Sequence, residues 1–293
     1  MSLPGSITER LSVHLSRYIG HAVDIEQGTA IGNGNNDCYR LDTDNGRFFV
    51  KVNSVDRFPS LFEAEADGLR RILATGTVRV PYVIAIGEDH DDGYLLLEHI
   101  AEGPTGPAFW RDFGRSLAAL HRNTADTFGL ERDNYIGTLK QVNTPDPDWT
   151  SFLITRRLEP LIQKAVDRKR LGSGDALRAE QLYRRLPSLF PEEPPALLHG
   201  DLWHGNLLCD TDGRPVLIDP AVYYGHREMD LAMSRLFGGS EASFHAAYNE
   251  AWPLAAGWAE RVDICNLYPL LVHVNLFGGA YAQQVRGLLK RFG

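Results

Sequence analysis

The stretch LHGDLWHGN occupies residues 198–206, and the apolar run PVLIDP follows it at residues 215–220. Within the first stretch, His199 and Gly200 precede Asp201, and Asn206 stands five residues after that aspartate. A D-x-x-x-x-N match alone often arises by chance, whereas H-G-D-x-x-x-x-N followed by a hairpin is much rarer. The pattern therefore predicts a short strand that leads into a polar loop carrying Asp201 and Asn206.

These residue types suit phosphoryl transfer, which needs a base for the attacking hydroxyl, metal ions for the phosphates and cations to offset charge. Asp201 is the candidate base, and Asn206 is the candidate Mg²⁺ ligand at the expected spacing. Asp219 ends the apolar strand, where a second metal ligand is expected. An Asp before Pro also begins ordinary turns. Its place thirteen residues after Asn206 favours the metal-binding interpretation.

Lys51 lies in RFFVKV (47–52), on the strand face opposite Val50. A lysine on an edge strand is usually solvated, so a phosphate-binding role requires an acidic partner on the next helix, predicted over residues 59–74. The apolar stripe of that helix contains Leu61, Leu69 and Ile72. Glu65 falls inside this stripe and Glu63 points almost to the opposite side. Because a carboxylate in an apolar stripe needs a cation, Glu65 is the predicted partner of Lys51.

A turn rich in glycine and amide side chains, GTAIGNGNND, occupies residues 28–37. Such turns can direct backbone N–H groups at phosphates, which makes Gly32, Gly34 and Asn36 candidate nucleotide-binding residues. No G-K-[ST] follows, so the turn is not a Walker loop. Most Gly-Asn turns are simple hairpins, so this turn indicates nucleotide binding only in combination with the other candidate site residues.

The loop that begins with His199-Gly200-Asp201 and ends at Asn206 is called the HGD loop below. Trp203 and His204 stand inside it, between the candidate base and the candidate metal ligand. Because both neighbours must reach metal and substrate, Trp203 is predicted to be partly exposed and to pack against substrate. His204 either contacts substrate or is simply solvated. His121 lies on an apolar helix face and His199 precedes the loop, so both histidines are predicted to be structural.

The bulk composition is that of a soluble globular protein, with 43% apolar and 23% charged residues among 293. The net charge of −8 argues against nucleic acid as a partner. The apolar runs are too short to span a bilayer and no secretory signal is evident, so no membrane partner is expected. Cys38, Cys209 and Cys265 are far apart, which predicts free thiols and a cytoplasmic location.

The order of elements predicts an α+β protein of two lobes, with a small β-rich lobe over residues 1–102 and a larger, mainly helical lobe over residues 103–293. Asn45 and Gly46 supply the positive φ angles for a hairpin, and GPTGP (103–107) marks the boundary. The second lobe is expected to contain helices at 108–123, 149–170 and 173–189, a loop-rich segment at 125–148 and further helices from 221 onward.

Four stretches are more specific than the loop itself. They are GDLWHGN (200–206), IDPAVYYGHREMDLAM (218–233), NYIG…QVN…W..F (134–152) and HVNLFGGAY (273–281). With them, nearly the whole chain resembles the fructosamine kinase (ketosamine-3-kinase) family. That family is related to aminoglycoside phosphotransferases and shares the two-lobed protein-kinase-like fold.

The resemblance implies a role for each site residue. Asp201 would be the base, Asn206 and Asp219 would bind Mg²⁺, and Lys51 with Glu65 would lie at the phosphates of ATP. The strand LLLEHI (95–100) matches the segment that joins the lobes, so the backbone near Glu98, His99 and Ile100 would hold adenine. The implied reaction transfers the γ-phosphate to O3 of a ketosamine sugar, which reverses glycation.

Several alternatives stay open at this point. The chain resembles kinases of small hydroxyl compounds generally, so an aminoglycoside phosphotransferase type is a second candidate. A nucleotide-binding pseudokinase is less favoured, because such proteins typically lack the Lys, the base Asp or the metal Asp. Whether the ketosamine is free or protein-bound, which sugar it contains, the oligomeric state and the redox activity of the thiols are all left open.

Overall fold

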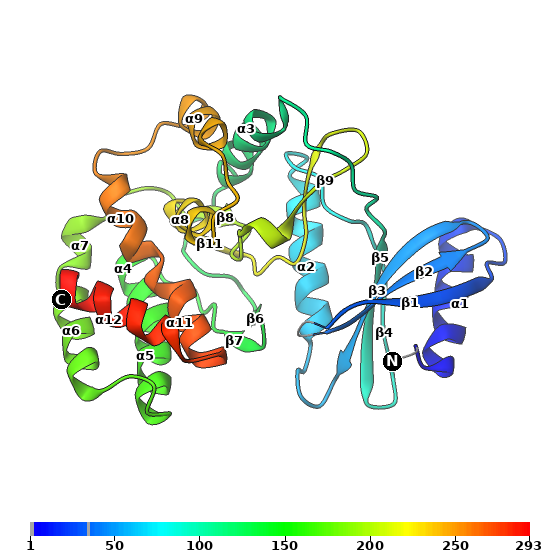
Figure 1. The fold of residues 1–293 in the computed structure, drawn as a ribbon, viewed down its shortest axis with the longest axis horizontal. Coiled ribbons are helices and arrows are strands. Elements are labelled where there is room, and N and C mark those ends of the chain that lie inside the picture. The colour runs from blue at the N-terminus through cyan, green and yellow to red at the C-terminus, as the bar shows by residue number, and fades with distance from the viewer. Residues whose placement is uncertain (1–2, 34–35) are drawn as a thin grey trace. The chain divides into compact units, whose positions relative to one another are not determined.

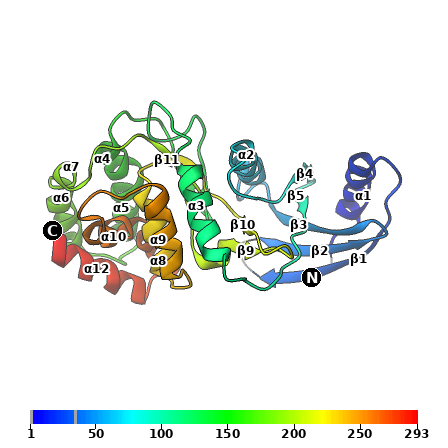
Figure 2. The same ribbon diagram turned by 90° about the horizontal axis from the view of Figure 1, so that it is seen from above.

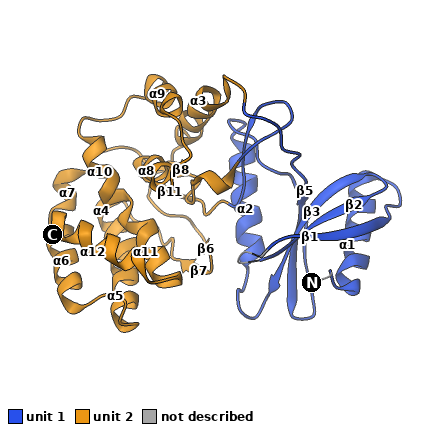
Figure 3. Cartoon of the chain, in the orientation of Figure 1, with its two compact units in different colours: residues 1–105, 208–219 blue, residues 106–207, 220–293 orange. Residues whose placement is uncertain are grey.

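The structure, a computed structural model, describes residues 3–33 and 36–293. The chain divides into two compact units (Figure 3): the first unit contains residues 1–105 and 208–219, and the second contains residues 106–207 and 220–293. The sequence-based division differs in that it assigned 208–219 to the second lobe. This hairpin groups with the first unit because its backbone pairs there: Gly103 N donates to Cys209 O, and Leu217 N donates to Arg79 O.

The first unit is built on an antiparallel sheet of five strands in the order β1-β2-β3-β5-β4 (Figure 1). Its elements are α1 (Gly5–Ile19), β1 (Ile25–Asn33), β2 (Asp37–Thr43), β3 (Gly46–Ser54), α2 (Leu61–Ala74), β4 (Val83–Asp89) and β5 (Asp92–Glu98), and a separate two-stranded hairpin of β9 (Leu207–Cys209) and β10 (Pro215–Leu217). The β2–β3 turn is where it was predicted, but only Gly46 of the Asn45-Gly46 pair has a positive φ, 106°.

Side chains alternate along β3 between the two faces of the sheet. Phe48, Val50 and Val52 are buried in a core that they share with α1. The residues of α1 in that core are Ile7, Leu11 and Leu15. Figure 2 shows α1 and α2 as two separate helices alongside the sheet. The predicted alternation is therefore confirmed, and it leaves Lys51 on the face opposite the core of α1.

The second unit is mainly helical, with short strand pairs between its helices. Its elements are α3 (Phe109–His121), β6 (Asn134–Ile136), β7 (Leu139–Gln141), α4 (Trp149–Phe152), the π-helix η1 (Leu153–Leu158), α5 (Glu159–Asp167), α6 (Ser173–Tyr183), α7 (Leu186–Leu189), β8 (Ala196–Leu198), the 3₁₀ turn η2 (His204–Asn206), β11 (Tyr223–Gly225), α8 (Glu228–Leu236), α9 (Ala242–Ala251), α10 (Trp258–Cys265), α11 (Leu267–Leu276) and α12 (Ala280–Phe292).

Two expectations for the second unit need correction. The segment 125–148 contains the β6–β7 hairpin, and β11 pairs with β8 before the helices resume. Strands of three residues are too short to show an alternating pattern, so periodicity does not indicate β6, β7 or β11. Likewise, the helix expected over 149–170 is interrupted by η1, and the one expected over 173–189 is divided before Pro187.

Along the described residues, no helix is both long and apolar enough to cross a membrane. The three cysteines are free thiols: Cys38 is half-buried, and Cys209 and Cys265 are buried. Helix α3 matches its predicted position, and its apolar face includes Phe113 and His121, which are buried. The core of the second unit is formed largely by α4 to α6 and α10 to α12.

Candidate active site

Lys51 is the centre of the polar site in the first unit. Its Nζ donates to Glu65 Oε1 and to Asp219 Oδ1, both at 2.7 Å, although the residue is only 2% exposed. Burial by itself disfavours the ammonium, but the charges of Asp219 and Glu65 outweigh burial and raise the pKa of Lys51. The expected ion pair with Glu65 is therefore present, and Glu63 remains partly exposed.

Asp219 adopts an unusual backbone conformation. Its φ of 55° lies in the left-handed region, which few residues other than glycine occupy and which Asp tolerates better than most. Such strain occurs mainly where the surrounding structure imposes it, often at functional sites. The side chain is 44% exposed while one oxygen binds Lys51, so the carboxylate can still bind a cation from solvent.

A cavity of about 200 Å³ lies beside these charges and is lined by residues of the first unit alone. Its apolar walls include Ile31, Phe49, Leu97, Leu208 and Ile218. Glu98, His99, Ile100 and Asp219 also line it. A mostly apolar cavity with a few polar groups at its margin is the usual form of a small-molecule binding site.

The side chain of Glu98 has a structural role that the sequence did not indicate. It accepts hydrogen bonds from Arg79 and from Tyr82 N, and the Glu98 backbone N–H donates to Tyr82 O at 2.9 Å. Arg79 also pairs with Asp210 of the β9–β10 hairpin. Arg79 thus ties that hairpin to the end of β5, and no local pattern around it would have revealed this.

The glycine-rich turn between β1 and β2 is described in part. Gly32 lies near the end of β1, and Gly34 is outside the described residues. The Asn36 amide oxygen accepts from Asn53 Nδ2 at 2.7 Å, which ties the turn to β3. Burial raises the pKa of the Cys38 thiol to about 11, although Lys51 opposes the shift. This cysteine is therefore a poor candidate for a reactive thiolate.

The HGD loop in the second unit closes on itself through Asn206. The Asn206 Nδ2 donates to Asp201 O at 2.9 Å and to Asp201 Oδ2 at 3.1 Å. Because the amide nitrogen serves the aspartate, the amide oxygen is the atom that can bind a metal. In the described ranges no group of three or more His, Cys, Asp or Glu could hold a metal ion. Taken by their chemistry alone, the amide oxygen of Asn206 and the carboxylate of Asp219 are of the oxygen-ligand type that Mg²⁺ prefers.

Asp230 on α8 clamps the start of this loop. Its two carboxylate oxygens accept from His199 N at 2.7 Å and Gly200 N at 3.0 Å. His121 Nε2 lies 3.2 Å from the same carboxylate, and the His199 ring accepts from Asp201 N at 3.3 Å. The structural roles predicted for His121 and His199 are confirmed. Asp230 was missed, although an acidic residue between Met229 and Leu231 was an available signal.

Trp203 is 39% exposed, as the partly exposed tryptophan was expected to be. Its indole covers Gly205, where a Cβ would come within 2.3 Å of the ring. The ring meets Phe237 edge-on with centroids 6.1 Å apart. His204 is exposed and lies against Gly239, where a Cβ would come within 2.7 Å of the His204 side chain.

Further aromatic rings extend from Trp203 across the second unit. Phe237 lies 4.8 Å from His273, and His273 lies 4.8 Å from Tyr281, between ring centroids. His273 Nδ1 is 2.8 Å from Pro269 O. Since a carbonyl only accepts, Nδ1 carries the proton and Nε2 is the acceptor in the neutral ring. The HVNLFGGAY stretch thus contributes His273 and Tyr281 to a surface that begins at the HGD loop.

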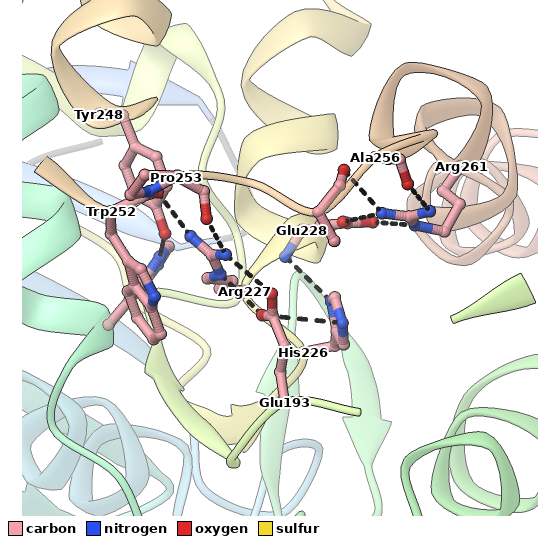
Figure 4. A network of polar contacts seen from close by, with 11 residues as sticks. Glu193, His226, Arg227, Glu228, Tyr248, Trp252, Pro253, Ala256 and Arg261 are labelled. Atoms are coloured by element: carbon pink, nitrogen blue, oxygen red, sulfur yellow. Dashed lines mark hydrogen bonds and ion pairs between the residues drawn. The ribbon is translucent and has the colours of Figure 1, made fainter. Parts of the chain in front are cut away.

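Figure 4 shows the network of polar contacts formed by His226, Arg227 and Glu228, which belong to the YYGHREMD stretch (223–230). Arg227 binds both carboxylate oxygens of Glu193 at 2.7 Å, and Arg261 binds both of Glu228 at 2.6 and 2.7 Å. His226 accepts from Glu228 N at 3.3 Å. These buried contacts fix the start of α8, the helix that carries Asp230, so this part of the stretch is structural.

The sequence model of the fructosamine kinase family matches residues 7–292. The chain belongs to the fructosamine kinase family. One relative is a probable ketoamine kinase of Enterococcus faecium, which is 42% identical over 89% of this chain and 93% of the relative. Another is a chloroplastic protein-ribulosamine 3-kinase of Arabidopsis thaliana, which is 38% identical over 92% of this chain and 83% of the relative.

A solved structure in the fructosamine kinase family supports the fold. The structure of a putative fructosamine-3-kinase from Thermobifida fusca superposes with a TM-score of 0.85 at 37% identity, covering 96% of this chain and 97% of the other. The predicted α+β class, with an antiparallel N-terminal sheet and a helical C-terminal part, is confirmed.

Proposed function

We propose that the protein is an ATP-dependent kinase that transfers the γ-phosphate to O3 of a ketosamine sugar. Its family and its relatives, a ketoamine kinase and a protein-ribulosamine 3-kinase, make it a phosphotransferase with a hydroxyl acceptor. The observation that supports the site best is the buried Lys51 with its two carboxylate partners beside the apolar cavity. Burying these charges carries a desolvation cost that need not stabilise the fold, so their presence favours a catalytic protein over one that has lost catalysis.

The proposed roles follow from the chemistry of each group. The Asp201 carboxylate accepts the proton of the attacking hydroxyl, whose oxygen bonds to the γ-phosphorus as ADP departs. Lys51, oriented by Glu65, binds the nucleotide phosphates, and the backbone of residues 98–100 receives adenine. Bound Mg²⁺, with Asn206 and Asp219 as its protein ligands, would offset the phosphate charge.

Trp203 and His204 are proposed to contact the acceptor. An exposed indole beside the base offers a flat apolar face for the C–H side of a sugar, and the imidazole of His204 offers a polar group for its hydroxyls. The proposal adds a cytoplasmic location, for which the three free thiols are the support. The partner is a ketosamine, either free or attached to a protein.

An assay of ADP release over a panel of acceptors tests this function. Fructosyl-lysine and ribulosyl-lysine, free and on a glycated protein, are expected to turn over in the presence of ATP and Mg²⁺. Aminoglycosides are expected to be inert. If aminoglycosides turned over and no ketosamine did, the ketosamine assignment would be wrong and the aminoglycoside phosphotransferase type would replace it.

A further inference from the structure

A buried cation of the second unit begins a chain of side-chain hydrogen bonds. Arg157 lies in the π-helix η1 and is fully buried. Its guanidinium donates to Asn143 Oδ1 at 2.6 Å and to Val142 O at 2.5 Å. It also lies over the rings of Tyr223, at 4.2 Å, and Phe152, at 4.6 Å. Ring faces and oxygens thus replace the water that this charge loses.

Three amides continue the chain away from the guanidinium. Asn143 Nδ2 donates to Asn134 Oδ1 at 2.8 Å, and Gln141 Nε2 donates to the same oxygen at 2.7 Å. The Tyr268 hydroxyl donates to Gln141 Oε1 at 2.6 Å. Because Arg157 only donates, Asn143 must present its oxygen to it, and every following amide is then held in one orientation.

The chain ends on two backbone carbonyls next to the HGD loop. Asn134 Nδ2 donates to Val222 O at 2.8 Å, and Gln141 Nε2 donates to Ala221 O at 3.1 Å. The Ala221 carbonyl faces Gly200, where a Cβ would lie only 2.1 Å from its oxygen. Gly200 has a φ of 82° and is followed directly by Asp201. One carbonyl oxygen therefore touches both the amide chain and the residue before the base.

We propose that Gln141, Asn134 and Asn143, oriented by Arg157, are positioning residues that hold the Ala221 carbonyl against Gly200 and thereby set the position of Asp201. The inference rests on the proposed function, in which Asp201 is the base. It also assigns a role to the NYIG…QVN stretch (134–143). None of the residues proposed to contact nucleotide or acceptor lies in that stretch.

Two further observations agree with this assignment. Asp230 on α8 accepts from the N–H groups of His199 and Gly200, so the Ala221 carbonyl is a second, separate contact at Gly200. Burial raises the pKa of Tyr268 to about 12; Arg157 opposes the shift, and the charge of Asp201 adds to it. Tyr268 is therefore a protonated donor to Gln141 and lies within electrostatic reach of the base.

The experiment removes the donor to Ala221 O while keeping side-chain volume. Gln141→Met loses all three hydrogen bonds of that amide, and Tyr268→Phe is a milder second variant in case the first folds poorly. For both we expect kcat with fructosyl-lysine to fall, by about 10- to 100-fold for Gln141→Met, because small misplacements of a reacting group are costly. KM for ATP and nucleotide affinity should stay within about twofold.

A matched control separates positioning from general destabilisation. Asp175 is also buried, and its Oδ2 binds Gly172 N at 2.9 Å and Arg286 Nε at 3.2 Å. Asp175→Asn should lower the melting temperature but leave kcat within about twofold of wild type. The inference fails if the folded Gln141 and Tyr268 variants keep wild-type kcat. It fails equally if the control loses as much kcat as Gln141→Met at a similar melting temperature.

Failure of the proposed function is distinguishable from failure of this inference. A wrong function would appear in the wild-type protein, which would not turn over fructosyl-lysine. The same variants would then be compared with wild type on whichever acceptor the panel identifies. A wrong inference would appear only as variants whose kcat equals that of an active wild type.

Discussion

Asp201 and Lys51 illustrate how single residues of this chain are prepared for different tasks. The Asp201 carboxylate accepts a hydrogen bond from the Asn206 amide at 3.1 Å, whereas Lys51 Nζ donates to two carboxylates at 2.7 Å. In the proposed mechanism Asp201 accepts a proton from the hydroxyl of the acceptor, so its carboxylate must come within hydrogen-bonding distance of that hydroxyl. A phosphate-binding ammonium must stay charged while buried, so it needs acidic partners.

Asp201→Ala should lower kcat with fructosyl-lysine by at least about 100-fold, the usual minimum for the loss of a general base. The affinity for ATP should change little, because the proposed base would contact only the acceptor. ADP release and calorimetric titration with a non-hydrolysable nucleotide measure the two effects. Turnover near the wild-type rate would show that another residue is the base.

The Lys51–Glu65 pair can be tested by a double-mutant cycle on nucleotide affinity. Lys51→Met removes a charged hydrogen-bond donor and should weaken ATP binding by about 1.5–3 kcal/mol. Glu65→Gln should act through the same lysine, so the combined loss should fall short of the sum by at least about 0.5 kcal/mol. Glu63→Gln is the matched control and should be silent. Strict additivity of the first two changes would argue against the pair.

Helix α8 is the element on which the HGD loop depends, because it carries Asp230. Its first turn is held by buried ion pairs from Glu193 and Arg261, and by His226. Burial lowers the pKa of His226 to about 4; Glu193 opposes this, while Arg227 adds to it. The imidazole is therefore neutral in the folded protein at pH values where an unfolded chain would already be protonated.

The stability of this element should consequently depend on pH. His226 contributes its full stability above its unfolded pKa of 6.5, and the contribution is lost as the pH falls from 6.5 toward 4. The shift corresponds to about 3 kcal/mol. Denaturant unfolding of wild type and His226→Gln between pH 7 and pH 4 should show a smaller acid loss in the variant. Parallel pH curves for the two proteins would refute the assignment.

At the scale of the whole molecule, the proposed site residues are shared between the two units. Lys51, Glu65 and Asp219 belong to the first unit, and Asp201 and Asn206 belong to the second. The first unit alone provides the apolar cavity and the buried lysine. The second provides Asp201, the proposed base, together with Asp230 on α8 and the aromatic side chains next to Trp203.

Nucleotide and metal should therefore stabilise the folded protein together. A non-hydrolysable ATP analogue at 100 times its Kd should add about 2.7 kcal/mol, and removal of Mg²⁺ with EDTA should abolish part of the gain. Thermal shift assays measure both. In Asp219→Ala the Mg²⁺-dependent part should disappear while a gain from nucleotide remains. A full Mg²⁺-dependent gain in both Asp219→Ala and Asn206→Ala would exclude the proposed ligands.

Local features of the site could be read from the chain because they depend on spacing and periodicity. The HGD loop, the hairpin after it and the face of β3 that carries Lys51 follow from residues a few positions apart. The helical period alone selected Glu65 over Glu63, and the ion pair at 2.7 Å agrees. The family resemblance followed from four short stretches, each of which can be recognised from residues close together in the sequence.

The remaining features depend on residues that are distant in the chain, and only tertiary structure brings these together. Asp219 reaches Lys51 across 168 positions, and Asp230 clamps a loop 30 positions before it. The π-helix that turns Arg157 inward has no periodic signature, and the strand β11 is too short to have one. The sequence by itself determined which groups the HGD loop presents. The folded chain decided what holds that loop, because hydrogen bonds between distant backbone and side-chain groups exist only once the surrounding elements have packed.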